Sequence, residues 1–508
     1  MWYAGAISFG RSAIRFIEAN LLLILFLCAV FALSVNQLGE YDAWFHLKTG
    51  DYIVANFSVP TQDIFSYTAP GAEWVTHSWL PEVLFFLVYK AVGLWGLIFF
   101  SALMLTFSYF LMVLLAKRWG GDRYILFLFV ATLAFLKIPS LSVPRPHLFS
   151  FMLLLVELLI LEHYLATKSR KYLALLPLLF LVWANMHASI VLGFMILVFY
   201  MLFARGLTPY LLASLAISFV NPNTYKIFTY QFAVQEVTKA LRVVEWFSVW
   251  DFRNYPGTQI FLAVLLVVNV WCVVSMLMKR TARDVRFAGL MIGFSGMLFL
   301  SIRHIGYFPL IAFPILSVKL GETKIVRSIF SKVSMDSVKF IVVFFMMVFA
   351  VAGYLHWPKK AVSETALPVQ AVDFILAEGI RGPVFNMYNE GGYLIWRLWP
   401  EQKVFIDGRS EIYKGQPLKD YVTMIGFGRG WQELVNEKYK INYALLPLAP
   451  SSANRFARIA TIQLLDNGFK IVYMDDAYII LLRDTKENME VVGKFEIDPE
   501  LFLGERKQ

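Results

Sequence analysis

The sequence predicts a polytopic α-helical membrane protein of about eleven transmembrane helices with a C-terminal soluble α/β domain. Apolar residues make up 58% of the 508 residues and charged residues only 16%, and the mean hydropathy is +0.61. A soluble protein would carry about 25% charged residues. Helices that cross hydrocarbon require such a deficit of charge. The long apolar runs end near residue 358, and the composition then becomes that of an ordinary soluble domain.

Apolar windows of membrane-crossing length predict the individual spans. The window at 83–116 is long enough for one span and a short interfacial helix. The predicted spans are 20–36, 83–116, 123–138, 147–166, 172–186, 188–204, 207–220, 259–278, 287–302, 305–318 and 337–355. Residues 1–358 therefore form the predicted membrane domain, with a long first outer loop at 37–79.

The positions of Lys and Arg predict the orientation of these spans. Basic residues cluster in alternate loops, as the positive-inside bias requires, so we expect the N-terminus to be cytoplasmic. An odd number of spans then places residues 359–508 outside the cell or in the periplasm of a bacterium. The net charge of +10 follows from these loops and does not imply nucleic-acid binding. The clusters are Arg11/Arg15, Lys117/Arg118, Lys168/Arg170/Lys171, Arg205, Lys279/Arg280/Arg283/Arg286 and Lys319/Lys324/Arg327/Lys332.

The C-terminal region alternates between helical and strand patterns, which predicts a small α/β sheet domain. An amphipathic pattern at 368–378 stops at Gly379, and the turn Asp475-Asp476 joins the last two predicted strands. We expect helices near 368–378, 416–438 and 453–466, and strands near 383–386, 404–406, 442–446, 469–474 and 478–483.

Titratable side chains gather in the loops that this topology places outside. Asp42 and His46 follow the first span, and Glu82 opens the next apolar helix. Asp42 is suited to act as a general base or as a ligand of a divalent metal, Mg or Mn, to which His77 could also contribute. We predict catalytic roles for Asp42, His46 and Glu82. Stabilisation of the helix N-terminus is the alternative role for Glu82.

Arginine and histidine side chains from three further outer segments predict a phosphate-binding region. Guanidinium groups pair bidentately with phosphate oxygens, and histidines can donate to them. Anchoring of the helices at the membrane interface is the alternative explanation for each histidine. The predicted phosphate-binding residues are Arg145, His147, His187, Arg303 and His304.

Two segments of the soluble domain combine glycines with polar and aromatic residues. The stretch 386–396 contains Gly391-Gly392, which favours either close approach of the backbone to a ligand or a tight turn from strand to helix. Asp407-Gly408-Arg409 follows a predicted strand, where α/β sheets bind ligands. A turn with a structural Asp407–Arg409 pair is the alternative. The predicted acceptor-binding residues are Tyr388, Glu390, Tyr393, Asp407 and Arg409.

These features together resemble the GT-C superfamily of membrane glycosyltransferases, most closely the catalytic subunit of oligosaccharyltransferases. Asp42-Ala43-Trp44-Phe45-His46-Leu47 is similar to the acidic opening of the family's first outer loop. Tyr388-Asn389-Glu390-Gly391-Gly392-Tyr393 resembles the family's WWDYG acceptor motif but lacks its Trp-Trp-Asp core. Bacterial predicted glycosyltransferases are also similar, in Arg145-Pro146-His147 and in Asp407-Gly408-Arg409.

The resemblance implies that Asp42 is the catalytic or metal-binding acid. The family's second acidic motif is missing, and Arg145-Pro146-His147 stands in its place. We therefore expect an enzyme of the inner, or plasma, membrane that transfers a sugar from a polyprenyl-phosphate or polyprenyl-diphosphate carrier to a protein or glycan acceptor outside. Two alternatives are a non-catalytic scaffold for envelope or pilus assembly and a transporter of lipids or solutes.

Overall fold

A computed structural model describes residues 20–122, 124–127, 142–252, 256–332, 335–448 and 451–503. These residues belong to two compact units, each assembled from separate stretches of the chain. The first unit contains residues 1–36, 95–221 and 242–359, and the second contains 37–94, 222–241 and 360–508. The basic residues Arg11 and Arg15 and most of the predicted span 123–138 lie outside the described residues.

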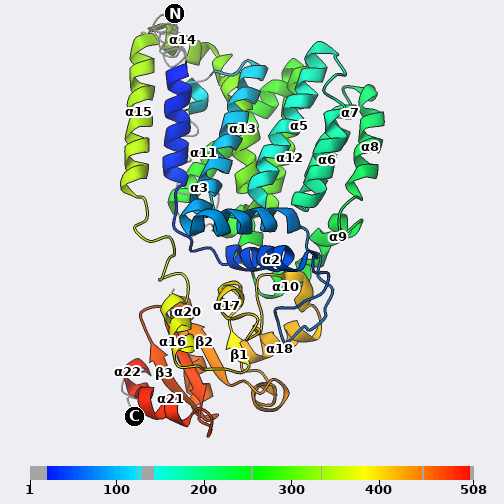
Figure 1. Ribbon diagram of the computed structural model, residues 1–508. Helices are drawn as coiled ribbons and strands as arrows, with labels where there is room; N and C mark the ends of the chain where they lie inside the picture. Colours follow the sequence, from blue (N-terminus) through cyan, green and yellow to red (C-terminus); the bar gives the residue numbers. More distant parts are fainter. Residues whose placement is uncertain are drawn as a thin grey trace, which may run out of the picture. The chain divides into compact units, whose positions relative to one another are not determined.

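The first unit consists of helices, and its helices α5 to α8 and α11 to α13 lie side by side (Figure 1). Its first described helix, Asn20–Ser34, is followed by residues 95–119 of α3 (Trp79–Trp119). The others are α5 (His147–Thr167), α6 (Leu175–Met186), α7 (Ile190–Met201), α8 (Thr208–Ser218), α11 (Pro256–Lys279), α12 (Ala282–Leu300), α13 (Tyr307–Gly321), α14 (Lys324–Lys332) and α15 (Met335–Leu355).

Three helical segments among the described residues are long and apolar enough to cross a membrane: α3, α5 and the segment Ile302–Gly321. Five further apolar helices are shorter, of which α6 and α7 have 12 residues each. About 20 residues are needed to cross the hydrocarbon core of a bilayer. The helical membrane fold therefore agrees with the sequence analysis, whereas the count of about eleven spans stays a prediction.

A buried ion pair fixes two helices of the first unit to each other. Arg286 of α12 donates from Nε and Nη2 to the two carboxylate oxygens of Glu162 on α5, at 2.7 and 3.1 Å. Tyr200 of α7 donates to the same carboxylate at 2.7 Å. Glu162 and Arg286 are both buried, and each neutralises the charge of the other, which would be costly to bury alone. These polar groups are accounted for by packing and need no ligand.

The second unit contains a four-stranded sheet with the order β1-β2-β4-β3. Strand β1 (Val384–Asn386) pairs in parallel with β2 (Tyr443–Pro447), and β4 (Tyr478–Arg483) runs antiparallel to both β2 and β3 (Phe469–Met474). The core of the sheet is apolar, because residues 479–482 of β4 are fully buried. The predicted strands at 383–386, 442–446, 469–474 and 478–483 are thus confirmed.

Helices surround this sheet and extend the unit beyond it. They are α2 (Asp42–Asn56), residues 79–94 of α3, α9 (Lys226–Ala233), α10 (Gln235–Ala240), α16 (Val369–Ala377), α17 (Gly391–Leu398), α18 (Gln416–Ile425), α19 (Trp431–Glu433), α20 (Ser451–Leu465), α21 (Met489–Phe495) and α22 (Pro499–Leu503). Gly93 has a non-helical backbone, with φ of 69°, and interrupts α3. Residues of α3 up to 94 belong to the second unit, and those from 95 belong to the first. Residues 42–56, expected as loop, form helix α2.

The predicted strand at 404–406 is wrong. Val404 makes only an isolated bridge with Ser66, in which the Val404 amide donates to Phe65 and its carbonyl accepts from Tyr67. The next amide, that of Phe405, donates to the side chain of Asn386 at 2.9 Å. Backbone groups of 404–406 therefore bond to residues 65–68 and to the side chain of Asn386, and not to a strand of the sheet.

Candidate active site

The half-buried carboxylate of Asp42 stands at the first turn of α2 and faces the backbone of the Asp407-Gly408-Arg409 segment. An added Cβ at Gly408 would lie 2.2 Å from Oδ1 of Asp42, so only glycine leaves room for the carboxylate. The start of the helix is fixed by Glu40, whose carboxylate accepts from the Ala43 amide at 2.8 Å. A helix N-terminus stabilises negative charge, so this position suits a carboxylate side chain.

The adjacent glycines of 391–392 allow α17 to pack against α2. A Cβ at Gly392 would lie 2.3 Å from the Tyr41 carbonyl oxygen, and one at Gly391 would lie 2.0 Å from that of Ile406. The close backbone approach that these glycines predict is therefore present, and the neighbouring groups are backbone segments of the same unit. Gly391, Gly392 and Gly408 together fix the surroundings of Asp42.

Replacing Gly408 by alanine is expected to displace the Asp42 carboxylate. The Cβ would overlap with Oδ1 of Asp42, so we expect a loss of activity on the order of tenfold or more, because small misplacements of a reacting group are costly. Sugar release from a lipid-linked donor measures the effect. Gly493→Ala is the matched control, since a Cβ there meets no atom within 4 Å. Equal activity of the two variants would contradict a positioning role for Gly408.

His46 and Glu82, both predicted to be catalytic, form a buried pair. Nδ1 of His46 lies 2.8 Å from Oε1 of Glu82, and Ser78 donates to the same oxygen at 3.1 Å. His46 lies one turn after Asp42, a spacing that places both on the same side of α2. The Glu82 carboxylate therefore fixes the orientation of the His46 imidazole, and Glu82 also lies in the first turn of α3.

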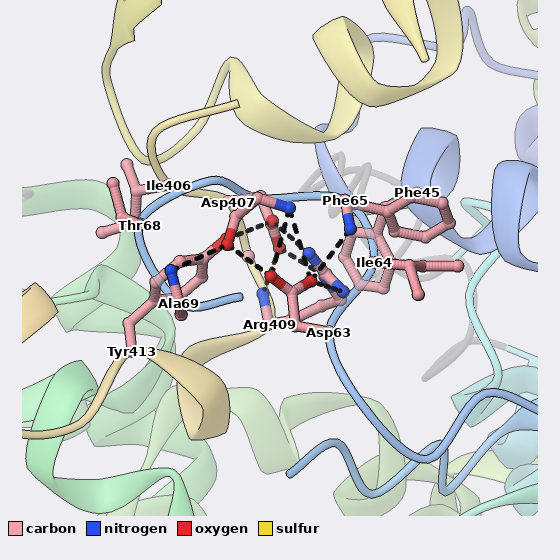
Figure 2. A network of polar contacts seen from close by, with 12 residues as sticks. Phe45, Asp63, Ile64, Phe65, Thr68, Ala69, Ile406, Asp407, Arg409 and Tyr413 are labelled. Carbon is pink, nitrogen blue, oxygen red and sulfur yellow. Dashed lines mark hydrogen bonds and ion pairs between the residues drawn. The ribbon is translucent and has the colours of Figure 1, made fainter. Parts of the chain in front are cut away.

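Asp407 and Arg409 belong to a buried network of ion pairs and hydrogen bonds that includes Asp63 (Figure 2). Arg409 donates from Nε and Nη2 to both oxygens of Asp407, at 2.8 and 2.7 Å, and its Nη1 lies 2.9 Å from Oδ1 of Asp63. The guanidinium also stacks over Trp74, 4.4 Å from the ring centroid. Tyr413 donates to Asp407 as well. The structural Asp407–Arg409 pair, which the sequence left as an alternative to acceptor binding, is present.

Tyr388 forms hydrogen bonds with Gly408 and Ser410 and lies close enough to Asp42 to be affected by its charge. Its hydroxyl lies 2.5 Å from Oγ of Ser410 and donates to the Gly408 carbonyl at 3.1 Å. Burial, and then the negative charge of Asp42, raise the pKa of Tyr388. Tyr393, by contrast, is buried against Trp44 and accepts from Arg397 at 2.8 Å. Tyr388 is therefore the predicted acceptor-binding tyrosine that the structure brings to Asp42.

Glu390 is buried at the start of α17, and burial raises its pKa to about 7 although its backbone amide acts in the opposite direction. An ordinary carboxyl titrates near 4.3 in the unfolded chain. As the pH rises from about 4 to 7, the unfolded state loses this proton while the folded state still holds it. The destabilisation by Glu390 therefore grows over this range and reaches its full size above pH 7.

Replacing Glu390 by glutamine is therefore expected to stabilise the protein at pH 8. The gain should be on the order of 1–3 kcal/mol and should shrink as the pH falls towards 4. Thermal unfolding of both proteins across this range measures the difference. A difference that stays constant with pH would contradict the raised pKa.

In the first unit, the predicted phosphate-binding arginines lie around Glu245. Nη1 of Arg145 donates to Oε1 of Glu245 at 2.6 Å, and the Arg303 guanidinium stands over Trp246 at 5.3 Å. Ser301 donates to the Glu245 carbonyl at 2.8 Å, which joins the loop before α13 to the segment 244–246. Partial burial raises the pKa of Glu245, but Arg145, Arg303 and His147 outweigh this effect and lower the pKa to about 2.

The three predicted phosphate-binding histidines take different positions. His147 opens α5 and contributes to the positive potential at Glu245. Nδ1 of His187 lies 3.0 Å from Oγ of Ser150. Ser150 lies one turn after His147 on α5. His304 is part of the segment Ile302–Gly306, and its Nδ1 is buried without a hydrogen-bond partner. Arg145, Arg303 and His147 thus lie around the Glu245 carboxylate. We call these four residues the Glu245 cluster.

No group of three or more His, Cys, Asp or Glu side chains suited to a metal ion occurs among the described residues. His77, a predicted contributor to such a site, stacks on Tyr230 with the ring centroids 3.9 Å apart. Among the described residues, neither Asp42 nor His77 is therefore part of a group of three such side chains, although Mg²⁺ and Mn²⁺ usually take several oxygen ligands.

Sequence reasoning did not assign a role to four residues that complete these sites. Asp63 and Tyr413 complete the buried network, Ser410 bonds Tyr388, and Glu245 pairs with Arg145. Asp63 and Glu245 stood out as acids in outer loops, which was the available indication. Their partners lie far away in the sequence, so the pairing itself was not predictable from local pattern.

Solved structures with the same fold are found by comparison of the coordinates. The archaeal oligosaccharyltransferase AglB from Archaeoglobus fulgidus, in complex with an inhibitory peptide and a dolichol-phosphate, is 11% identical, with a TM-score of 0.58 over 90% of this chain and 73% of AglB. The same enzyme with a tethered acceptor peptide is 10% identical, with a TM-score of 0.57 over 93% and 75% of the chains. ArnT from Cupriavidus metallidurans in the apo state is 13% identical, with a TM-score of 0.52 over 92% and 98%.

Both are membrane glycosyltransferases of the GT-C superfamily, so the predicted GT-C resemblance is confirmed for the fold. This chain has the GT-C fold over about nine-tenths of its length. No protein-family profile matches the sequence. No curated protein matches it either.

Proposed function

We propose that this protein is a glycosyltransferase that moves a sugar or oligosaccharide from a polyprenyl-phosphate or polyprenyl-diphosphate carrier to an acceptor on the extracytoplasmic face. The observation that carries the proposal is the half-buried Asp42 carboxylate, which glycines hold at the start of α2 in a chain with the GT-C fold. A carboxylate that lies next to a phenol and against Gly408 can accept a proton during a reaction.

In this proposal Asp42 removes the proton from the attacking hydroxyl or amide of the acceptor. The acceptor atom forms a bond to the anomeric carbon as the bond from that carbon to the carrier phosphate breaks. The carrier leaves with both bonding electrons as its free phosphate or diphosphate. His46, held by Glu82, orients the surroundings of Asp42, and Tyr388 contacts the acceptor.

The Glu245 cluster is the proposed binding site for the carrier phosphate. Arg145 and Arg303 keep their positive charge at any physiological pH, and guanidinium groups suit phosphate oxygens. AglB was solved with a dolichol-phosphate, which is a lipid-linked phosphate of the class proposed here. In the alternative form of this proposal Asp42 is a ligand of a divalent metal, Mg or Mn. AglB has also been solved with Zn and sulfate.

Mass spectrometry of envelope glycans and glycoproteins in cells with and without the gene tests this function. We expect one class of glycan to lose a sugar in the deletion strain, and the missing product to return with the wild-type gene. Accumulation of the lipid-linked donor should accompany the loss. An unchanged glycan profile together with an assembly defect would favour the scaffold instead, and altered transbilayer distribution of lipid would favour the transporter.

A further inference from the structure

The Glu245 cluster contains an internal carboxylate at the place where an anion would bind. Oε1 of Glu245 lies 2.6 Å from Nη1 of Arg145, which is the geometry of a charge-assisted hydrogen bond to a phosphate oxygen. Arg303 and His147 also direct positive potential at this carboxylate. An arriving phosphate would compete with Glu245 for the same donor on Arg145.

We propose that Glu245 occupies the position of the donor phosphate on Arg145 and must leave it before a phosphate binds. The inference rests on the proposed phosphate-binding role of the Glu245 cluster. It assigns to Glu245 a second task, which is to make binding selective for anions that displace a carboxylate. Anions with more charge, or with more oxygens for Arg145 and Arg303, do this best.

The exposure of the two partners indicates which one moves. The Glu245 side chain is 40% exposed, whereas that of Arg145 is 15% exposed. A rotation of the Glu245 side chain can therefore carry its carboxylate into solvent while Arg145 stays in place. Water and the remaining cations then solvate and pair with the carboxylate, so the displacement does not leave a buried charge without a partner.

The local backbone permits this rotation without a change of fold. Glu245 lies in the three-residue 3-10 helix Val244–Trp246, and its carbonyl is held by Ser301 through the main chain. The neighbouring contact from the Ile302 amide to the Phe247 carbonyl, at 2.8 Å, also involves main-chain atoms. The side chain is thus free to change rotamer while both anchors persist.

The alternative is that Glu245 only orients Arg145 for the ligand, and the two roles predict opposite signs for Glu245→Gln. Removal of a competitor tightens anion binding, whereas removal of an orienting partner weakens it. We expect the purified full-length Glu245→Gln protein to bind inorganic pyrophosphate about tenfold more tightly than wild type, because one charge-assisted hydrogen bond no longer has to be broken.

Isothermal titration calorimetry at constant ionic strength measures these affinities. Asp251→Asn is the matched control, because it removes the same charge from a nearby position, where the Asp251 carboxylate accepts from the Ser248 amide. It should bind within about twofold of wild type. Thermal unfolding of each variant verifies that it is folded.

Arg145→Gln separates this inference from the proposed function. If Arg145→Gln weakens pyrophosphate binding and Glu245→Gln tightens it, displacement is supported. If Arg145→Gln weakens binding but Glu245→Gln leaves it unchanged or weaker, displacement is overturned while the phosphate site stands. If Arg145→Gln has no effect, or if no folded variant binds, the phosphate site and the inference are both overturned.

Discussion

Asp42→Asn is expected to reduce sugar transfer by about 10²- to 10⁴-fold, the usual loss when a general base is removed. Asparagine has nearly the same shape as aspartate, so the glycine contacts around position 42 are retained and the fold should be unaffected. The amide cannot accept the acceptor proton, and it also lacks the charge that the helix N-terminus stabilises. Turnover of a synthetic lipid-linked sugar by the purified protein in detergent measures the effect.

The matched control for this experiment is Asp51→Asn in the same helix. Asp51 lies two turns further along α2 and pairs with Lys48 at 3.2 Å. We expect its removal to change activity by less than about twofold, since the Asp51 side chain is 37% exposed and Lys48 keeps its contact with the Trp396 ring. Full activity of a folded Asp42→Asn protein would remove Asp42 from the proposed mechanism and with it the strongest argument for an enzyme.

Arg409→Ala is expected to destabilise the protein by about 3–5 kcal/mol, as is usual when one partner of a buried ion pair is removed. Asp407 and Asp63, each less than 5% exposed, would remain buried next to each other without a countercharge. The stacking of the guanidinium over Trp74 and Phe65 would also be lost. Thermal or denaturant unfolding of the purified protein measures the difference.

Lys470→Ala provides the comparison for this stability measurement. Lys470 pairs with Glu496 at 2.6 Å in the same unit, but both side chains are about 40% exposed. Such a pair contributes about 0–1 kcal/mol. Arg409→Lys should fall between the two variants, because lysine keeps the charge but not the planar set of donors. Equal stability of Arg409→Ala and Lys470→Ala would show that the buried network is not needed for the fold.

The sequence was sufficient for those features that depend on composition or on local pattern. The lack of charge identifies a membrane protein, and alternating patterns locate all four strands of the sheet. Gly391 and Gly392 favoured close backbone approach or a tight turn, and the close approach is present at both. The close approach of Gly408 to Asp42 was not predicted. The choice of Asp42, Tyr388 and Arg145 followed from chemistry and from resemblance, and their roles stay predictions.

The remaining features depend on contacts between distant parts of the chain. Val404–Ile406 has the composition of a strand, but its backbone pairs with residues 65–67, more than 330 positions earlier. Residues 42–56 were expected as loop because they lie between two predicted spans, but they form helix α2, which packs against α17. Glu245 lies 100 positions after Arg145, so neither residue indicates the other.

The buried network of Asp63, Asp407 and Arg409 has a consequence for the order of biosynthesis. Thr68 bonds the Phe405 carbonyl across 337 positions, so residues 37–94 leave the ribosome long before their partners exist. Until residues 404–409 are synthesised, Phe65 and Trp74 lack their contacts with Arg409. Pairing over such distances is slow because the intervening chain must be closed into a loop. Maturation of the second unit therefore depends on completion of the whole polypeptide, and a chain interrupted after the last helix of the first unit would leave the region around Asp42 unassembled.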